Sequence, residues 1–339
     1  MKAVLLNDTR NDKHWGCLTV IDAIERHCQH NGIELIATSP LGHNWENDPI
    51  FMRKLSSSDC IIVNGEGTIH SSSAAGYRLL RAGGVAKELH KKSALINMTW
   101  QNNSPEFEAM ARDFDIISVR ESESAASLQS AQIASYVIPD LALSIHSNLK
   151  SPQKDVGAAD KSIGFTDNVL GASAYQIYKK MWKYDAELIS MFYDKSGWDG
   201  FAFFLRRFLI KSDIIKPAKL AFAIKAARAD MQKQCANLPE FLEKVTGKTL
   251  ILTGRFHMMI YALATQTPFL VLKSNTHKNE ATLRDSGLDP RRLITIDQID
   301  EGMLEWAGQW HDGELQQLQA YLDESQKKLS MLFSRIKSL

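Results

Sequence analysis

The stretch from Thr249 to Lys273, TLILTGRFHMMIYALATQTPFLVLK, constrains the fold of this 339-residue chain more than any other. A short apolar run leads through Gly254 to Arg255 and His257, and an apolar helical segment and a second apolar run follow. Strand, turn, helix and strand in that order predict a βαβ unit and therefore a parallel sheet. Ligands of such sheets bind at the carboxyl ends of the strands. We therefore expect Arg255 and His257 to lie at a ligand-binding edge.

The remainder of the chain repeats this alternation and divides into two parts. Strand patterns alternate with helical patterns over residues 1–146, which predicts a doubly wound α/β, Rossmann-like domain. Residues 147–161 are polar and include proline, glycine and lysines, so we interpret them as a linker. A second Rossmann-like domain is expected over 162–312, with a helical insertion at 174–232. A long polar helix is expected at 313–339.

Composition and patterning exclude several classes of protein. The 40 lysines and arginines balance 39 acidic residues, so the net charge of +1 does not favour nucleic acid as a partner. The 4 cysteines lack CxxC spacing, so neither a disulfide framework nor a metal site is expected, and a reducing cytoplasm fits. The N-terminus has no signal-peptide pattern. No apolar run reaches the roughly 20 residues that a membrane-spanning helix needs.

A carboxylate between two glycines is the main candidate site of the first half. Gly65, Glu66 and Gly67 follow a strand that ends at Asn64, and His70 lies close behind. Glycines allow a ligand to approach the backbone closely, and Glu66 could act as a general base or bind sugar hydroxyls. The alternative for the glycines is a purely structural turn, and His70 either assists Glu66 or has a structural role.

Arg120 is a second candidate, because it follows another predicted strand. A guanidinium there can bind phosphate or carboxylate through two N–H donors. The alternative is a surface ion pair with Glu121 or Glu123. Further polar residues on the expected ligand side are Arg10, His14 and Asp167.

The segment 175–232 differs from the rest because it is rich in both aromatic and basic residues. One interpretation is a helical lobe with a buried aromatic core. The other is peripheral contact with anionic lipids, which would place the protein at the inner face of the cytoplasmic membrane.

Residues 252–257, LTGRFH, together with the helix and strand that follow, resemble the second-domain signature of the polysaccharide pyruvyl transferase family. In that family an Arg-x-His follows a strand and leads into an alanine-rich helix, a turn and a strand. Weaker matches lie at 59–68, 117–122, 139–140 and 165–167, and at Lys278 with Leu283, Gly287 and Leu288. The matches cover most of the chain except 175–232.

The resemblance implies a fold like that of the GT-B glycosyltransferases, with an acceptor-side domain, a donor-side domain and the active site in the cleft. It implies transfer of an enolpyruvyl-derived group from phosphoenolpyruvate to a sugar hydroxyl pair, giving a pyruvate ketal. The pathway would be synthesis of a bacterial surface polysaccharide of the cell envelope, such as a capsule. Arg255 and His257 carry over as donor-site residues, and Arg120 as a further candidate.

The chemistry suggests roles for these residues. Phosphoenolpyruvate carries a phosphate and a carboxylate, so Arg255 and either Arg120 or Lys278 would serve as cationic anchors. The methylene carbon must gain a proton and a sugar hydroxyl must lose one, and His257 and Glu66 would divide these transfers. Neither a cofactor nor a metal is required.

Two departures from the family pattern keep another reaction open. The family's glycine triplet is Gly65–Glu66–Gly67 here, and 175–232 replaces the middle of the second domain. A GT-B glycosyltransferase that takes a nucleotide sugar and acts on a glycan or lipid-linked acceptor would suit the same cleft, with Glu66 as base. A third hypothesis is a non-catalytic carbohydrate-binding or scaffold protein.

Overall fold

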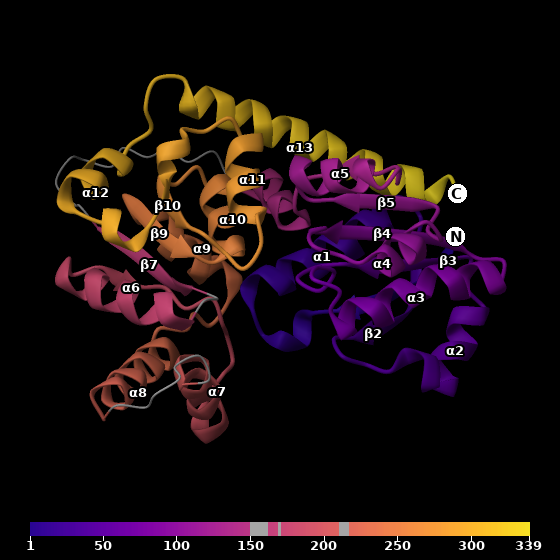
Figure 1. Ribbon diagram of the computed structural model, residues 1–339, viewed down its shortest axis with the longest axis horizontal. Helices are drawn as coiled ribbons and strands as arrows, with labels where there is room; N and C mark the ends of the chain where they lie inside the picture. The colour runs from indigo at the N-terminus through magenta and orange to yellow at the C-terminus, as the bar shows by residue number, and fades with distance from the viewer. Residues whose placement is uncertain (150–161, 169–170, 210–216) are drawn as a thin grey trace. The chain divides into compact units, whose positions relative to one another are not determined.

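The computed structural model describes residues 1–149, 162–168, 171–209 and 217–339 (Figure 1). The chain forms two compact units. The first unit consists of residues 1–12, 17–144 and 323–339, and the second of residues 13–16 and 145–322.

The first unit is built on a six-stranded parallel sheet in the order β2-β1-β3-β4-β5-β6 (Figure 1). Its strands are β1 (Lys2–Asp8), β2 (Glu34–Pro40), β3 (Cys60–Asn64), β4 (Lys92–Met98), β5 (Ile116–Val119) and β6 (Tyr136–Val137). Its helices are α1 (Trp15–His30), α2 (Pro49–Ser56), α3 (Ala74–Glu88), α4 (Pro105–Ala111) and α5 (Ser122–Ser130), with 3₁₀ turns η1 (Arg10–Asp12), η2 (Trp45–Asn47) and η3 (Leu141–Asn148).

The central strands of this sheet are apolar on both faces, as parallel strands covered by helices must be. Every residue of β3 is buried, and the core cluster joins Val4 and Leu6 of β1 to Ile61 and Val63 of β3. Each such aliphatic side chain contributes about 1.5–3 kcal/mol when it leaves water.

The second unit is built on a five-stranded parallel sheet in the order β11-β10-β9-β7-β8. Its strands are β7 (Ile163–Asn168), β8 (Glu187–Leu188), β9 (Leu250–Gly254), β10 (Phe269–Leu272) and β11 (Leu293–Ile294). Its helices are α6 (Gly171–Lys183), α7 (Gly197–Leu209), α8 (Pro217–Gln232), α9 (Leu238–Thr246), α10 (Phe256–Ala264), α11 (Lys278–Asp285) and α12 (Glu301–Ala307), with 3₁₀ turns η4 (Pro290–Arg292) and η5 (Ile296–Gln298). Helix α13 (Glu314–Lys337) begins in this unit and continues into the first.

The two sheets share one connectivity. In each unit the first strand lies between the second and the third, so the chain reverses its direction of winding between the first and third strands. Ligands of doubly wound sheets bind beside the carboxyl ends of the strands at this switch point. The switch points are β1/β3 and β7/β9, and the expectation of two parallel α/β, Rossmann-like domains is confirmed.

Two sequence predictions need correction or limitation. The segment 174–232 is not wholly helical, because it contains β8, which pairs with β7. Helix α6 and β8 thus belong to the Rossmann-like unit, and among the described residues of the segment α7 and α8 are the additional helices. Residues 150–161 of the predicted linker lie outside the described residues.

Residues 13–16 belong to the second unit because their backbone pairs there. His14 and Phe192 form an antiparallel bridge, and the Trp15 N–H donates to the Met191 carbonyl at 3.0 Å. The Trp15 ring lies 4.4 Å from the ring of Tyr193. Residues 13–16 therefore pack in the second unit, although they lie early in the sequence.

Candidate functional site

The switch point of the first unit is held together by two asparagines. The Asn7 side chain donates to the Asn64 carbonyl at 2.7 Å, and the Asn64 side chain donates to the Asn7 carbonyl at 3.2 Å. Asn7 has a φ of 64°, a left-handed conformation that asparagine tolerates better than most residues. This reciprocal pair fixes the carboxyl ends of β1 and β3 side by side.

Glu66 lies directly above this clamp and is 6% exposed. Its carboxylate accepts hydrogen bonds from the Thr9 hydroxyl at 2.9 Å, the Cys17 thiol at 3.2 Å and the Asn64 amide at 3.4 Å. Burial, and then the charge of Asp140, raise the pKa of Glu66 above its ordinary value. A carboxyl group with a raised pKa at a switch point is suited to acid–base chemistry.

Cys17 serves Glu66 as a donor rather than as a nucleophile. Burial and the nearby Glu66 carboxylate hold the pKa of this thiol well above its usual range, so it stays protonated. Sequence reasoning missed both Thr9 and Cys17. Thr9 follows β1 as Glu66 follows β3, and that shared position was the signal that could have found it.

Close packing at position 65 and the backbone conformation at position 67 both require glycine. A Cβ on Gly65 would lie 2.5 Å from the Met98 Cβ, and the Gly65 N–H donates to the Ile96 carbonyl at 2.7 Å. Gly67 has a φ of 66°, which strains any other residue. The turn therefore explains both glycines, while Glu66 remains available for chemistry.

Arg120 lies inside the first unit and is 3% exposed. Its guanidinium donates to Asp140 at 3.0 Å and to the Thr99 hydroxyl at 2.8 Å. The expected surface position of Arg120 is therefore wrong: Arg120 is buried where it follows β5, beside the end of β4, and Asp140 reaches it there. The pair balances its own charge and acts electrostatically on Glu66.

Two other predicted residues of the first unit, His70 and Arg10, have contacts with residues other than Glu66. His70 pairs through its backbone with Gln101, and its Nδ1 lies 3.3 Å from the Ser71 hydroxyl. Arg10 forms ion pairs with Asp8 at 2.7 Å and with Glu25 at 2.6 Å. These carboxylates hold the Arg10 guanidinium at the end of β1.

At the switch point of the second unit, Arg255 and Asp167 form a two-pronged ion pair. Asp167 belongs to β7, and Arg255 follows β9 as the N-cap residue of α10. Arg255 Nε and Nη2 donate to the two Asp167 oxygens at 2.6 and 2.7 Å. Nη1 makes no hydrogen bond within the described part of the chain. One edge of the guanidinium is thus fixed and the other can receive an anion.

The base of this pair is made rigid by neighbouring polar groups. The Arg255 N–H donates to the Thr253 hydroxyl at 2.8 Å, and that hydroxyl lies 2.6 Å from the hydroxyl of Thr166. Any side chain at Gly254 would overlap Asn168, whose amide donates to the Lys273 carbonyl at 3.2 Å. The carboxyl ends of β7, β9 and β10 are therefore tied together directly beneath Arg255.

His257 and His14 meet within the second unit. Their ring centroids lie 5.6 Å apart, and the His14 ring also contacts Phe192 edge-on at 5.0 Å. His14 Nδ1 accepts the Gly16 N–H at 3.1 Å, which leaves Nε2 as the protonated nitrogen of the neutral ring. A Cβ at Gly16 would overlap the His257 ring, so only glycine allows His257 to occupy this position.

Lys278 follows β10 at the same edge of the sheet as Arg255. It begins α11, is 9% exposed, and its Nζ donates to the Asn275 side chain at 2.9 Å. The structure thus brings Arg255, His257, Lys278, His14 and Asp167 together in the second unit, and Glu66, Asn64, Gly65 and Gly67 in the first. Among the described residues no cluster of His, Cys, Asp and Glu could hold a metal ion.

Two parallel Rossmann-like units, as found here, make up the fold of the GT-B glycosyltransferases. A solved lipopolysaccharide outer core galactosyltransferase, WaaB, aligns with a TM-score of 0.52 at 11% identity, over 100% of both chains. An α-glucosyltransferase solved in complex with UDP and a 13-mer DNA is also similar, with a TM-score of 0.48 at 12% identity over 98% of this chain and 94% of that one. A putative UDP-N-acetylglucosamine 2-epimerase from Listeria monocytogenes aligns with a TM-score of 0.48 at 12% identity, over 97% of this chain and 90% of that one.

The family model of the polysaccharide pyruvyl transferases matches residues 10–276, and the chain belongs to that family. No curated protein matches the sequence. Family membership makes the chain a transferase of polysaccharide pyruvylation, with a glycan as acceptor. Within the described residues no helix is long and apolar enough to cross a membrane.

Proposed function

We propose that the chain transfers pyruvate from phosphoenolpyruvate to a pair of sugar hydroxyls on a polysaccharide or its lipid-linked precursor, without a cofactor. The observation that carries this proposal is the Arg255–Asp167 pair at the switch point of the second unit. It presents a pre-oriented guanidinium beside the N-terminus of α10, which also favours anions.

The donor's two anionic groups need two cations. We assign two cations to phosphoenolpyruvate: Arg255, whose Nη1 makes no hydrogen bond to the described residues, and Lys278, on the neighbouring strand end. Arg120 is the less suitable anchor, because Asp140 already neutralises it inside the first unit. Its role in this proposal is to balance Asp140 near Glu66.

The reaction requires balanced proton transfers. Two C–O bonds form to sugar oxygens, the C–O bond to phosphate breaks, and the methylene group becomes a methyl group. Of the two hydroxyl protons, one is matched by the proton gained at carbon and the other leaves with inorganic phosphate. We assign proton donation at carbon to Glu66, whose raised pKa favours its acid form, and hydroxyl activation to His257.

Phosphoenolpyruvate should raise the melting temperature of the wild-type protein, whereas UDP-glucose and UDP-galactose should not. A ligand at about 100 times its Kd stabilises the folded state by about 2.7 kcal/mol. Arg255→Ala should abolish the shift and Asp167→Asn should weaken it, because the asparagine cannot hold both guanidinium nitrogens as a charged partner. Differential scanning fluorimetry with each ligand measures these shifts.

The matched control is Arg291→Ala, which removes another arginine from a two-pronged aspartate pair, with Asp289, at the other end of the same sheet. Its shift with phosphoenolpyruvate should equal that of the wild type. Stabilisation by a nucleotide sugar alone would overturn the assignment of the donor and favour glycosyl transfer.

We further propose a cytoplasmic location with peripheral contact to the inner face of the cytoplasmic membrane, through the aromatic and basic segment 174–232. Helices α7 and α8 lie side by side there (Figure 1). Trp198 at the start of α7 is 78% exposed, Leu220 on α8 is also exposed, and Arg206 adds a cation. An exposed tryptophan beside basic residues suits the interface of an anionic bilayer.

Vesicles containing phosphatidylglycerol should therefore sediment the wild-type protein at low salt, and the double variant Trp198→Ala/Arg206→Glu should remain largely in the supernatant. Near an anionic surface each cation contributes about 1 kcal/mol, so charge reversal has a large effect on partitioning. Ile50→Ala, which removes an exposed apolar side chain on α2, is the control. Equal sedimentation of the wild type and the double variant would exclude this surface.

A further inference from the structure

A pocket lies in the second unit, away from the donor residues. It has a volume of about 650 Å³ and is lined by residues 287–291, which precede β11, by residues 309–312, which follow α12, and by Glu314 and Gln317 in the first turn of α13. Arg292, next to the pocket, donates to the carbonyl of Phe269, the first residue of β10. The pocket therefore lies at the amino ends of the strands, whereas Arg255 and Lys278 follow the carboxyl ends.

The charges around this pocket cancel in pairs. Arg292 is fully buried and donates to both oxygens of Glu314, at 2.8 and 2.6 Å. Arg291 pairs in the same manner with Asp289, at 3.1 and 2.6 Å. Both guanidinium groups are therefore paired with carboxylates, and among the described residues that line the pocket no lysine or arginine is left to bind a phosphate or carboxylate ligand.

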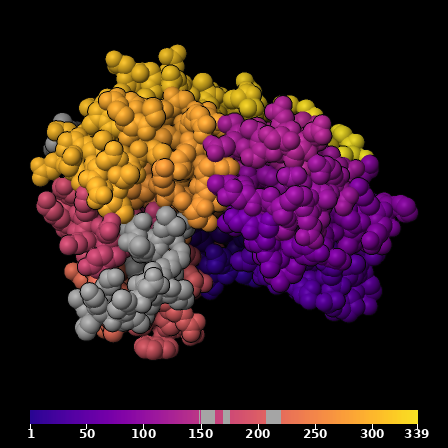
Figure 2. Space-filling model, viewed as in Figure 1, coloured from indigo at the N-terminus to yellow at the C-terminus, as the bar shows by residue number. Residues whose placement is uncertain are grey.

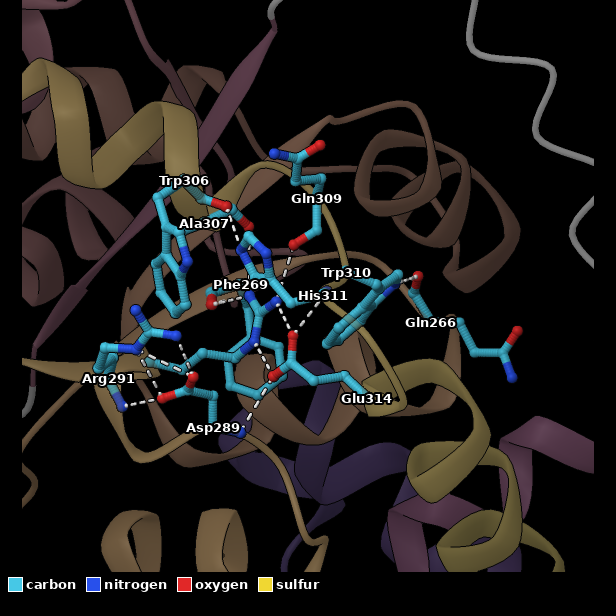
Figure 3. A network of polar contacts seen from close by, with 11 residues as sticks. Gln266, Phe269, Asp289, Arg291, Trp306, Ala307, Gln309, Trp310, His311 and Glu314 are labelled. Carbon is cyan, nitrogen blue, oxygen red and sulfur yellow. Dashed lines mark hydrogen bonds and ion pairs between the residues drawn. The ribbon is translucent and has the colours of Figure 1, made fainter.

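The aromatic side chains around the pocket are held in fixed positions. The Trp310 indole N–H donates to the Gln266 carbonyl at 3.0 Å, and the Arg292 guanidinium lies 4.4 Å from its ring. His311 stacks on Trp306 with ring centroids 4.6 Å apart. Figure 3 shows Trp306 and Trp310 on either side of this network. Rings held from several sides present a rigid surface to a ligand.

Three polar side chains of the pocket have hydrogen-bonding capacity to spare. Gln309, Asp312 and Gln317 line it, are exposed, and make no side-chain hydrogen bond within the described part of the chain. In Figure 3 the Gln309 amide points away from the charged network. Two amides supply both donors and acceptors, and Asp312 supplies acceptors together with a negative charge that has no ion-pair partner among the described residues.

We infer that this pocket binds a neutral stretch of glycan, as a subsite for the acceptor polysaccharide distinct from the donor site. Sugar hydroxyls need paired donors and acceptors, and the apolar faces of sugar rings pack against an indole such as Trp310. The volume falls within the roughly 300–1,000 Å³ of ordinary ligand sites. Asp312 has no ion-pair partner among the described residues, and its negative charge disfavours phosphorylated ligands such as phosphoenolpyruvate or a nucleotide.

This inference rests on the proposed function, because a pyruvyl transferase that modifies polysaccharide meets a polymer rather than a single sugar. The orange and yellow segments that contain the two loops lie at the surface in Figure 2, where a long chain can reach them. A second point of attachment raises the effective concentration of the polymer at its enzyme. The subsite should therefore favour long acceptors over short ones.

Affinity electrophoresis in native gels containing dextran, galactan or mannan, without phosphoenolpyruvate, tests the subsite. At least one polymer should retard the wild-type protein. The variant Asp312→Ala/Gln317→Ala should bind at least about fivefold more weakly, as expected from the loss of one or two hydrogen bonds. The matched variant Asp297→Ala/Gln316→Ala changes an exposed aspartate and an exposed glutamine that do not line the pocket, and should bind as the wild type does.

No retardation by any of the three polymers, or equal retardation of the Asp312→Ala/Gln317→Ala variant and the wild type, would overturn the subsite. Arg255→Ala separates this outcome from a failure of the proposed function, because it should lose the shift with phosphoenolpyruvate and keep full retardation. If wild-type protein is retarded but does not bind phosphoenolpyruvate, the donor assignment fails while the glycan subsite stands. Since the altered side chains are exposed, the melting temperature of both double variants should match the wild type.

Discussion

Replacing Glu66 with glutamine should lower the rate of pyruvyl transfer by about 10²- to 10⁴-fold, the usual contribution of a general acid or base. The amide keeps the shape of the side chain and can still accept the hydrogen bond from Thr9, but it cannot carry a proton to the substrate. Release of inorganic phosphate from phosphoenolpyruvate in the presence of the acceptor glycan measures the rate. Activity near the wild-type level would remove Glu66 from the mechanism.

The same substitution should stabilise the protein at pH 8. Burial raises the pKa of Glu66 above its ordinary value of 4.5, so the folded protein holds this proton at pH values where the unfolded chain has lost it. As pH rises through the folded pKa, the wild type must bury a charge, and it loses stability relative to the glutamine variant. At pH 4.5 the folded wild type keeps this proton, so no charge is buried in either protein, and the difference should be much smaller than at pH 8.

Urea unfolding of the two proteins at pH 4.5 and pH 8 measures this difference. The control is Glu34→Gln, an exposed glutamate on β2, which should show no such pH dependence relative to the wild type. A stability gain of equal size at both pH values would show that charge burial is not its cause. A gain at pH 8 combined with a loss of activity would identify Glu66 as a group kept at a cost to stability for the sake of chemistry.

The sequence predicted the strand ends well because an apolar run and a polar residue or glycine directly after it mark the same position. An apolar run followed at once by Asn64 or by Gly254 marks a buried strand that reaches a polar edge, and parallel strands place such residues on one edge. This argument found Glu66, Arg255 and His257 without knowledge of the strand order, whereas Lys278 was named from the resemblance to the family. Because the two sheets share one strand order, the same argument identified candidate residues in both units.

The partners of these residues could not be predicted, since they depend on long-range pairing. Asp167 lies 88 positions before Arg255, and only the adjacency of β7 and β9 brings them together. Cys17 reaches Glu66 across 49 positions in the same manner. Strand β8 was missed for another reason: it has two residues and lies within an aromatic segment whose pattern favours helix.

Arg292 shows most clearly what a sequence does not reveal, because in the printed chain it is one of two adjacent arginines. Arg291 is exposed and pairs at the surface, whereas Arg292 is fully buried and donates to Glu314 and to three backbone carbonyls. The carbonyls belong to Phe269, Ala307 and Gln309. The second arginine thereby ties β10 to the loop between α12 and α13.

Arg292→Met should destabilise the protein by about 3–5 kcal/mol, because it leaves a buried carboxylate without its partner. Arg291→Met, the adjacent control, should have little effect, since surface pairs contribute little. Adding Glu314→Leu to Arg292→Met removes the orphaned charge and should recover part of the loss. Urea unfolding followed by tryptophan fluorescence measures all three variants.

The contribution of the Arg292–Glu314 pair should also depend on pH in a definite direction. Burial alone would raise the pKa of Glu314, but hydrogen bonds from Arg292 and from the N–H groups of His311 and Asp289 outweigh it, and the pKa lies below its ordinary value of 4.5. The stabilisation is therefore present above pH 4.5 and is lost as pH falls through the lower folded pKa. The gap between wild type and Arg292→Met should narrow below pH 4.5, and a constant gap would show that packing of the arginine, rather than its charge, holds the loop.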